Sequence, residues 1–185
     1  GAAGWGLGTW STGVTSTDAL RIWTQSNFGE DLIFAARGGN LFFWDATDAL
    51  TTRGVLLSSE SGASNVPAIV NTVLVSDNRF VFCFGTNVLG STDIDPMLLR
   101  WSDQENAVNW TPSATNQAGD LRLSKGSEII TAIQGRQEIL VWTDSALYAL
   151  QYVGAPAVWS SQTVGENLSI ASPSTVAYAN GVAYW

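Results

Sequence analysis

Four hairpin-like segments recur along the chain, and this repetition constrains the fold more than any other feature. Each segment is an apolar run, a short turn containing Gly, Asn, Asp or Arg, and a second apolar run. The segments lie near residues 32–45, 72–84, 128–152 and 175–185, so their starts at 32, 72, 128 and 175 are 40, 56 and 47 residues apart. Repetition at this period is typical of propellers and similar arrays, in which one small sheet cannot bury its own face.

The runs within these segments predict small antiparallel sheets. Residues 97–102 return as a third strand beside 72–84, and three runs within 128–152 make up most of a four-stranded blade. Asn180-Gly181 stands between two apolar runs, and this pair favours a tight hairpin because both turn residues need positive φ. The sequence therefore predicts an all-β fold, a β-propeller-like array of small antiparallel blades.

Segments between the hairpins have weaker patterns. Residues 21–24 indicate a short strand followed by a turn at 26–29, and residues 85–96 read as a polar insertion. Residues 154–160 and 165–170 are interpreted as connectors to the last hairpin, and residues 45–50 and 103–109 as single helical turns.

The domain organisation follows from the same patterns. Residues 1–20, in which Gly alternates with aromatic residues, are expected to form a lead-in arm, and residues 21–185 a partial β-propeller domain. The chain stops at Trp185 within an apolar run, which leaves a strand edge open. Either the chain is a fragment of a longer protein or a neighbouring chain completes the sheet. We favour the fragment, because a propeller needs its last blade closed against its first.

Composition excludes several functions. The chain has no His, which removes imidazole bases and His metal ligands, and its single Cys, Cys83, is expected to be a small buried hydrophobe. The net charge is −8, and Lys125 and the seven Arg residues are scattered. A protein that grips DNA clusters its basic residues on one surface, so specific DNA binding is not expected. No apolar run approaches the roughly 20 residues that span a bilayer.

Two carboxylates, Asp93 and Asp95, are the only metal candidates. Both lie in a polar loop beside Ser91 and Thr92, and oxygen ligands suit Ca²⁺. A third carboxylate and a turn glycine are missing, so a solvated turn with Asp side chains bound to backbone N–H groups is the preferred interpretation. No cofactor is predicted.

An acidic residue follows an aromatic strand end three times, at Trp44-Asp45, Trp101-Ser102-Asp103 and Trp142-Thr143-Asp144. One interpretation is the rim of a ligand site. We prefer packing of the rings between blades, with each Asp accepting a hydrogen bond from a turn N–H. A glycosidase would need two acids about 5–10 Å apart in a cleft, and Asp103, Glu105 and Asp120 form no such pattern, so no enzyme and no catalytic residue is predicted.

Large side chains on the predicted strands form the expected core, namely Leu32, Phe34, Phe42, Trp44, Phe82, Trp101, Ile130, Val141, Trp142 and Tyr148. Five arginines near strand ends are expected to tie blades or subunits together, because the planar guanidinium binds carboxylates and carbonyls. These are Arg37, Arg79, Arg100, Arg122 and Arg136.

Several stretches resemble the tail nozzle (tail tubular) proteins of short-tailed bacteriophages. The most specific begins Asp95-Pro96-Met97-Leu98-Leu99-Arg100-Trp101 and runs through Asn109-Trp110-Thr111-Pro112 to Asp120. Residues 21–33, 38–45 and 140–154 are also similar, as is the Gly/aromatic pattern at 4–10. The resemblance covers most of the chain, although members of that family are much longer.

The resemblance implies a structural protein of the virion tail, made in the host cytoplasm. Its copies would form a ring beneath the portal and adaptor, touching other tail proteins such as fibres or a needle, and the ring would line the channel through which genomic DNA leaves without being specifically bound. The sequence leaves a second function open, a carbohydrate-binding β-propeller that recognises a receptor glycan through exposed Trp rings.

Overall fold

A computed structural model describes residues 21–185, and the predicted arm at 1–20 lies outside these residues. The described part is all-β, with short antiparallel strands, a single turn of 3-10 helix (Leu57–Ser59) and no α-helix. The all-β prediction is therefore confirmed, and so is the prediction of small antiparallel sheets. None of the four sheets is closed.

Each of the first three sheets contains four strands in sequence order. The first sheet contains β1 (Trp23–Phe28), β2 (Asp31–Ala36), β3 (Leu41–Trp44) and β4 (Val55–Leu56). The second contains β5 (Val70–Val75), β6 (Val81–Asn87), β7 (Ile94–Trp101) and β8 (Gly119–Arg122). The third contains β9 (Ile129–Gln134), β10 (Glu138–Thr143), β11 (Ala146–Gly154) and β12 (Val158–Glu166).

The fourth sheet is a two-stranded hairpin of β13 (Ala177–Ala179) and β14 (Val182–Tyr184). Its turn residues, Asn180 and Gly181, have φ of 52° and 82°, so the predicted left-handed turn is present. This conformation suits Asn and Gly and matches the natural twist of the two strands.

Five segments differ from the sequence-based predictions. Residues 26–28 belong to β1 and not to a turn, and residues 94–96 extend β7 instead of ending an insertion. Residues 158–166 form β12 and complete the third sheet, although 158–160 and 165–166 fall in the segments interpreted as connectors. The expected helical turns at 45–50 and 103–109 are loops without helix. In each missed strand the side chains are mixed or polar, which hides the alternation that marks a half-buried strand.

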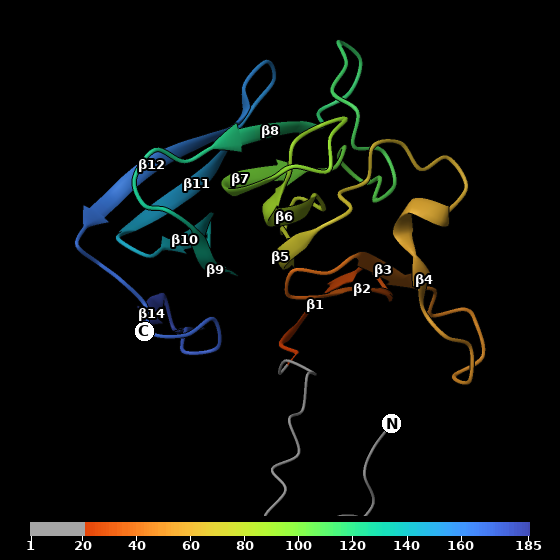
Figure 1. Ribbon diagram of the computed structural model, residues 1–185, viewed down its shortest axis with the longest axis horizontal. Helices are drawn as coiled ribbons and strands as arrows, with labels where there is room; N and C mark the ends of the chain where they lie inside the picture. The colour runs from red at the N-terminus through yellow and green to blue at the C-terminus, as the bar shows by residue number, and fades with distance from the viewer. Residues whose placement is uncertain (1–20) are drawn as a thin grey trace, which may run out of the picture.

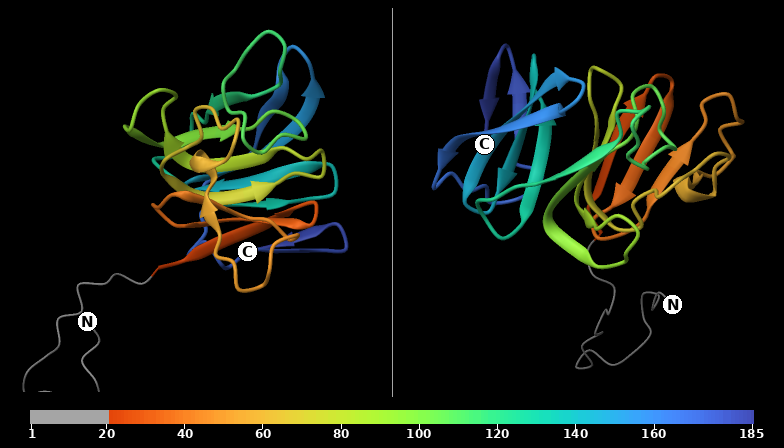
Figure 2. Two further views of the ribbon diagram at one scale, coloured as in Figure 1. Left: turned by 90° about the vertical axis from the view of Figure 1, so that its right-hand side faces the viewer. Right: turned by 90° about the horizontal axis from the view of Figure 1, so that it is seen from above.

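The first three sheets stand side by side in chain order, and the C-terminal hairpin lies beyond the third (Figures 1 and 2). Neighbouring sheets meet through their first strands, since β5 contacts β1 on one side and β9 on the other, and β9 also contacts β13. The second sheet is therefore covered on both faces, whereas each end of the array has only one neighbour.

Hydroxyl side chains join the first two sheets. Thr24 Oγ1 accepts a hydrogen bond from the Val73 N–H (3.1 Å), and Ser26 Oγ accepts one from the Val75 N–H (3.0 Å). The two hydroxyls are two residues apart, so they point to the same side of β1 and meet alternate amides of β5. Hydroxyls thus satisfy the Val73 and Val75 N–H groups. At the start of β5, Val70 instead forms an isolated backbone bridge with Gly39 (Val70 N to the Gly39 carbonyl, 2.9 Å).

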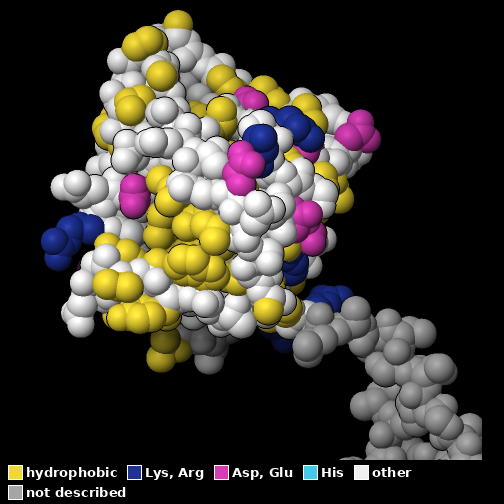
Figure 3. All heavy atoms as spheres, turned by 90° about the vertical axis from the view of Figure 1, so that its left-hand side faces the viewer, with side chains coloured by type: hydrophobic (Ala, Val, Ile, Leu, Met, Phe, Trp, Pro, Cys, Tyr) yellow, Lys and Arg dark blue, Asp and Glu magenta, His cyan; other side chains and the backbone are white. Residues whose placement is uncertain are grey.

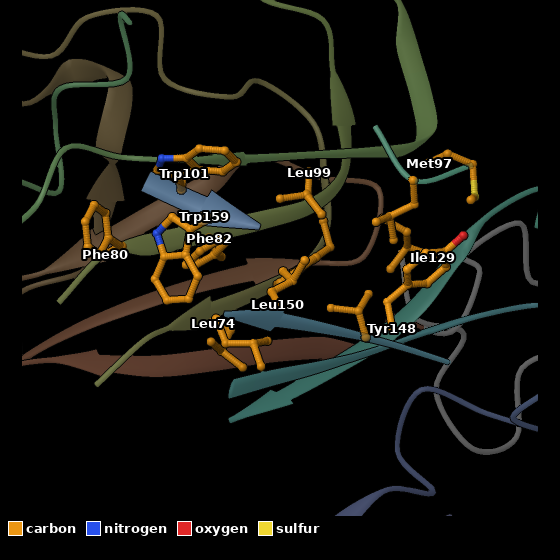
Figure 4. Packing of buried hydrophobic residues seen from close by; sticks show 14 of the residues in the cluster. Leu74, Phe80, Phe82, Met97, Leu99, Trp101, Ile129, Tyr148, Leu150 and Trp159 are labelled. Atoms are coloured by element: carbon orange, nitrogen blue, oxygen red, sulfur yellow. The ribbon is translucent and has the colours of Figure 1, made fainter. Parts of the chain in front are cut away.

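Two apolar clusters fill the spaces between neighbouring sheets. Between the first and second sheets, Ile33, Ala35 and Leu41 pack with residues of β5 and β6. Between the second and third sheets, Phe82, Leu99 and Trp101 face Tyr148, Leu150 and Trp159 (Figure 4). Gly119 admits the Trp101 indole, because a Cβ at Gly119 would lie 2.6 Å from Trp101 Cζ2.

Four of the five principal core residues are buried, namely Phe82, Trp101, Trp142 and Tyr148. The expectation for Trp44 is wrong, since this residue is only half-buried, and Leu32, Phe34, Phe42 and Ile130 are also half-buried. In the first sheet the reason is the face on which they lie. Ile33, Ala35 and Leu41 point toward the second sheet, whereas the larger residues at 32, 34, 42 and 44 point away from it.

Candidate functional site

The aspartates that follow Trp44, Trp101 and Trp142 are all bound to turn N–H groups, as predicted, although the Trp44 ring lies on the outward face of the first sheet and not between sheets. Asp45 accepts from Thr47 N (2.7 Å) and Asp103 from Gln104 N and Gln117 N (2.9 Å each). Asp144 accepts from Ser127 N (2.8 Å) and from the Ser127 hydroxyl (2.5 Å).

The hydrogen bonds to Asp45 and Asp144 favour the ionised forms of these two carboxylates. Those from the Thr47 side chain and backbone lower the pKa of Asp45, and those from the Ser127 side chain and backbone lower the pKa of Asp144. The three aspartates therefore hold loops in place.

Asp93 and Asp95, the metal candidates, do not converge on a common point with further ligands. Asp95 Oδ1 accepts from Met97 N (3.0 Å) and Asp95 Oδ2 lies 2.5 Å from Arg122 Nε. Asp93 is exposed, and its backbone N–H donates to Ser91 Oγ. Within residues 21–185, no three His, Cys, Asp or Glu side chains are grouped so that they could hold a metal ion.

The acids considered for glycoside hydrolysis each have a separate set of neighbours. Glu105 Oε2 lies 2.5 Å from Arg79 Nε, while both hydrogen bonds of Asp103 Oδ1 go to backbone amides. Asp120 pairs in register with Arg100 and is exposed. None of these three residues lines the cleft that the structure shows between the second and third sheets.

Two of the five arginines link different sheets. Arg37 Nη1 donates to the Ile130 carbonyl (2.9 Å) on β9, which connects the first sheet to the third. The Arg79 guanidinium stands 4.8 Å from the centre of the Phe28 ring, which connects the second sheet to the first. Such cation–π contacts add to the apolar packing between the sheets.

Arg100 is a buried cation, with 2% of its surface exposed. Its Nη2 donates to the Asn65 carbonyl (2.7 Å) and the Trp110 carbonyl (3.4 Å), so it anchors two long loops against β7. Burial lowers the pKa of the Arg100 guanidinium, and burial raises the pKa of the neighbouring Cys83 thiol. Cys83 is completely buried, as predicted, and is therefore an unreactive packing residue.

A cleft of about 280 Å³ opens between the second and third sheets. One wall is the β5–β6 turn at Ser76, Asp77 and Asn78. The other wall is the β9–β10 turn, with Gln134 and residues 136–138. Tyr152 and Trp159 complete the lining. The sequence-based prediction missed this cleft, because its walls come from separate repeats and Trp159 lies on the strand that was interpreted as a connector.

Aromatic contacts fix the rings of the cleft. Trp159 meets Phe82 edge-on at 4.9 Å and Phe80 at 5.6 Å, and Tyr152 lies 5.4 Å from Trp159. Trp159 is 6% exposed and lies deep in the packing, whereas Tyr152 is 37% exposed. The Tyr152 hydroxyl donates to Gln117 Oε1 (3.0 Å), which fixes the orientation of the exposed ring.

A second surface feature is the outward face of the first sheet. Phe34 and Phe42 are stacked on it at 5.4 Å, and Trp23 lies 6.0 Å from Phe34. The β3–β4 loop crosses part of this face, since the Trp44 indole N–H donates to the Thr52 carbonyl. Trp23 nevertheless remains 52% exposed.

The opposite end of the array is also apolar. The hairpin of β13 and β14 covers part of the third sheet, where Trp185 lies 5.7 Å from the buried Trp142. Its outward side chains, Val182 and Tyr184, are 48% and 58% exposed. The surface on this side of the molecule carries a broad hydrophobic patch with charged side chains around it (Figure 3).

Neither a scan of protein-family models nor a search of curated proteins finds a match to this chain. In residues 21–185, no helix has the length and apolar character needed to cross a membrane.

Proposed function

We propose that this protein is a structural subunit of a ring-shaped bacteriophage tail nozzle. In this proposal its sheets are blades of a β-propeller that is completed by further sheets. Copies of the protein form a ring in the virion tail, in contact with other tail proteins, and the ring lines the channel for DNA ejection. The role is structural and uses no catalytic residue.

The observation that carries the proposal is the pair of apolar end faces. The second sheet is buried on both sides, but the Trp23–Phe34–Phe42 face at one end and the Val182–Tyr184 face at the other lack a second sheet among the described residues. Exposed apolar faces of this kind mark sites of association. Such a face at each end of the array favours the packing of a further sheet against the first sheet and of another against the C-terminal hairpin.

The charge of the chain supports passage of DNA and not its retention. A net charge of −8 with a single lysine gives little phosphate neutralisation, which is the main source of protein affinity for DNA. A channel wall of this composition would let the duplex slide.

Electron microscopy of the purified protein tests the proposal. Ring-shaped particles with a central hole are expected, and a map of the ring should show a neutral or negative lumen. Particles that remain single arrays at all concentrations, or a ring with a strongly positive lumen, would contradict it.

A further inference from the structure

The structure carries an inference that does not depend on the proposed tail function. We propose that the cleft between the second and third sheets binds a neutral, hydroxyl-rich ligand, namely a hexose unit of a glycan. Its volume of about 280 Å³ is close to the lower end of small-molecule pockets, about 300 Å³, so it suits one sugar residue better than a larger ligand.

The chemistry of the walls points to this class. Asp77 and Glu138 offer acceptors, Arg136 offers donors, and the amides of Asn78 and Gln137 offer both. A sugar hydroxyl both donates and accepts, so a ring bearing several hydroxyls can satisfy such a mixed lining. The lining carries two carboxylates and one guanidinium, so its net negative charge disfavours binding of a polyanion.

The polar side chains are available for a ligand. Arg136 forms no ion pair within residues 21–185, whereas Arg37, Arg79 and Arg122 each pair with a carboxylate. The Asp77 carboxylate also makes no ion pair or hydrogen bond to the described residues, and the Glu138 carboxylate accepts only one long hydrogen bond, 3.4 Å, from Gln151 Nε2.

The exposed apolar part of the lining is the Tyr152 ring, whose orientation is fixed by its neighbours. Tyr152 is fixed by its contacts with Phe80 and Trp159 and by the hydrogen bond from its hydroxyl to Gln117. A ring that is oriented before binding loses little conformational entropy when the ligand arrives. Its exposed part can receive the C–H face of a sugar while the turn residues bind the hydroxyls.

The two turns give the walls a defined shape. The Ser76 hydroxyl accepts from Phe80 N (3.1 Å), and Arg79 N donates to the Ser76 carbonyl (2.8 Å), which closes the first turn. Gly135 N donates to the Glu138 carbonyl (2.8 Å), and Arg136 N donates to the Tyr178 hydroxyl (3.2 Å), which supports the second. The cleft is thus largely preformed, as small-molecule sites usually are.

The test uses the full chain and three neutral hexasaccharides, maltohexaose, cellohexaose and N-acetylchitohexaose, with saturation-transfer NMR and calorimetry as the readouts. At least one sugar is expected to bind with micromolar to low-millimolar Kd. Tyr152→Leu and Gln137→Ala should each weaken that binding by about tenfold or more, which corresponds to about 1.4 kcal/mol. Tyr152→Phe keeps the ring but loses the hydrogen bond to Gln117, so it should weaken binding less than Tyr152→Leu does.

Tyr184→Leu is the matched control, because it removes an exposed tyrosine far along the chain from the cleft, and it should change the Kd by less than about twofold. Gln137 is exposed, so its variant tests the site even if Tyr152→Leu fails to fold. Absence of binding by all three sugars would overturn the proposal. Unchanged sugar affinity in both the Gln137→Ala variant and a folded Tyr152→Leu variant would also overturn it. A Lys-containing pentapeptide is tested in parallel, and binding of this peptide without binding of any sugar would assign the cleft to peptides and overturn the proposal.

Discussion

Single side chains, at the residue scale, hold the loops of this protein to its strands. Asp144 binds both the backbone N–H and the hydroxyl of Ser127, just ahead of β9, and the buried Arg100 binds the carbonyls of two long loops. Each contact satisfies backbone groups that no strand partner can reach. Loop positions therefore depend on a few polar residues whose removal leaves unpaired groups.

Asp144→Asn is expected to lower stability at neutral pH by up to about 1 kcal/mol, the scale of exposed charge contacts. Hydrogen bonds from Ser127 lower the folded-state pKa of Asp144 below its ordinary value of 3.8. The carboxylate therefore stabilises the fold above about pH 4, and this contribution disappears as the pH falls through the folded-state pKa. Urea unfolding at pH 7 and pH 3 checks the prediction.

The difference between the wild type and Asp144→Asn should be present at pH 7 and should shrink at pH 3. Asp48→Asn is the control, since the Asp48 side chain is exposed and binds no described residue, and it should have little effect at either pH. An equal difference at both pH values would show that the charge of Asp144 contributes nothing.

At the scale of elements, β1 and β5 are joined by side chains and not by a backbone ladder. The hydroxyls of Thr24 and Ser26 accept from alternate amides of β5, and Val73 is 4% exposed. An amide left without an acceptor at such a site costs about 1–3 kcal/mol. The two sheets are therefore held together by apolar packing and also by hydrogen bonds that fix the register of β1 against β5.

Thr24→Val should destabilise the protein by about 1–3 kcal/mol, because the Val73 N–H loses its acceptor while the side-chain volume hardly changes. Thr24→Ser keeps the hydroxyl and should cost less than half as much. Urea unfolding gives the free energies, and hydrogen exchange of the Val73 amide reports the contact directly. Faster exchange of this amide in Thr24→Val alone is expected, and equal exchange in both variants would contradict the role of the hydroxyl.

Local patterns predicted much of this level of structure. The hairpin predicted at 32–45 is observed at 31–44, because its apolar runs and turn residues lie close together in the sequence. The strand at 158–166 was missed because most of its side chains are polar or exposed, as suits an edge strand. The choice of face in β2 and β3 was wrong because alternation shows that two faces differ, but not which of them meets a neighbouring sheet.

The candidate cleft could not be predicted for a related reason. Its turn residues 76–78 and 134–138 are ordinary polar turn residues in the sequence. They become the walls of one cleft only because the second and third sheets pack face to face. The aspartates after Trp44, Trp101 and Trp142, in contrast, were interpreted correctly, since their hydrogen bonds depend on nearby turns.

At the scale of the whole molecule, neither outermost face of the array is covered by a further sheet from residues 21–185. The third sheet shows what a covered outer face achieves, since its Trp142 is completely buried beneath Trp185 and other residues near the C-terminus. The outward face of the first sheet has comparable aromatic residues but is only partly covered. Burial of that face would gain roughly 25 cal/mol for each Å² of apolar surface removed from water.

The double change Phe34→Ser and Phe42→Ser is expected to weaken self-association by about tenfold or more while the sheets remain folded. Both rings point away from the second sheet, so the cores between the sheets are untouched. Sedimentation velocity over a concentration series measures the association, and circular dichroism checks the fold.

Leu50→Ser removes a residue that is 91% exposed and is the control, which should associate like the wild type. Association that is equally strong in the double variant would show that copies of the protein meet through some other surface.

The hydroxyl contacts between β1 and β5 also limit how the chain can change in length. Because side chains alternate along a strand, deleting one residue between Thr24 and Ser26 would send one of the two hydroxyls to the solvent side. An apolar side chain could take the vacated place, but it could not accept from the β5 amide. Insertions and deletions should therefore be tolerated in the loops and not within residues 23–28. This short strand sets the register between the first and second sheets.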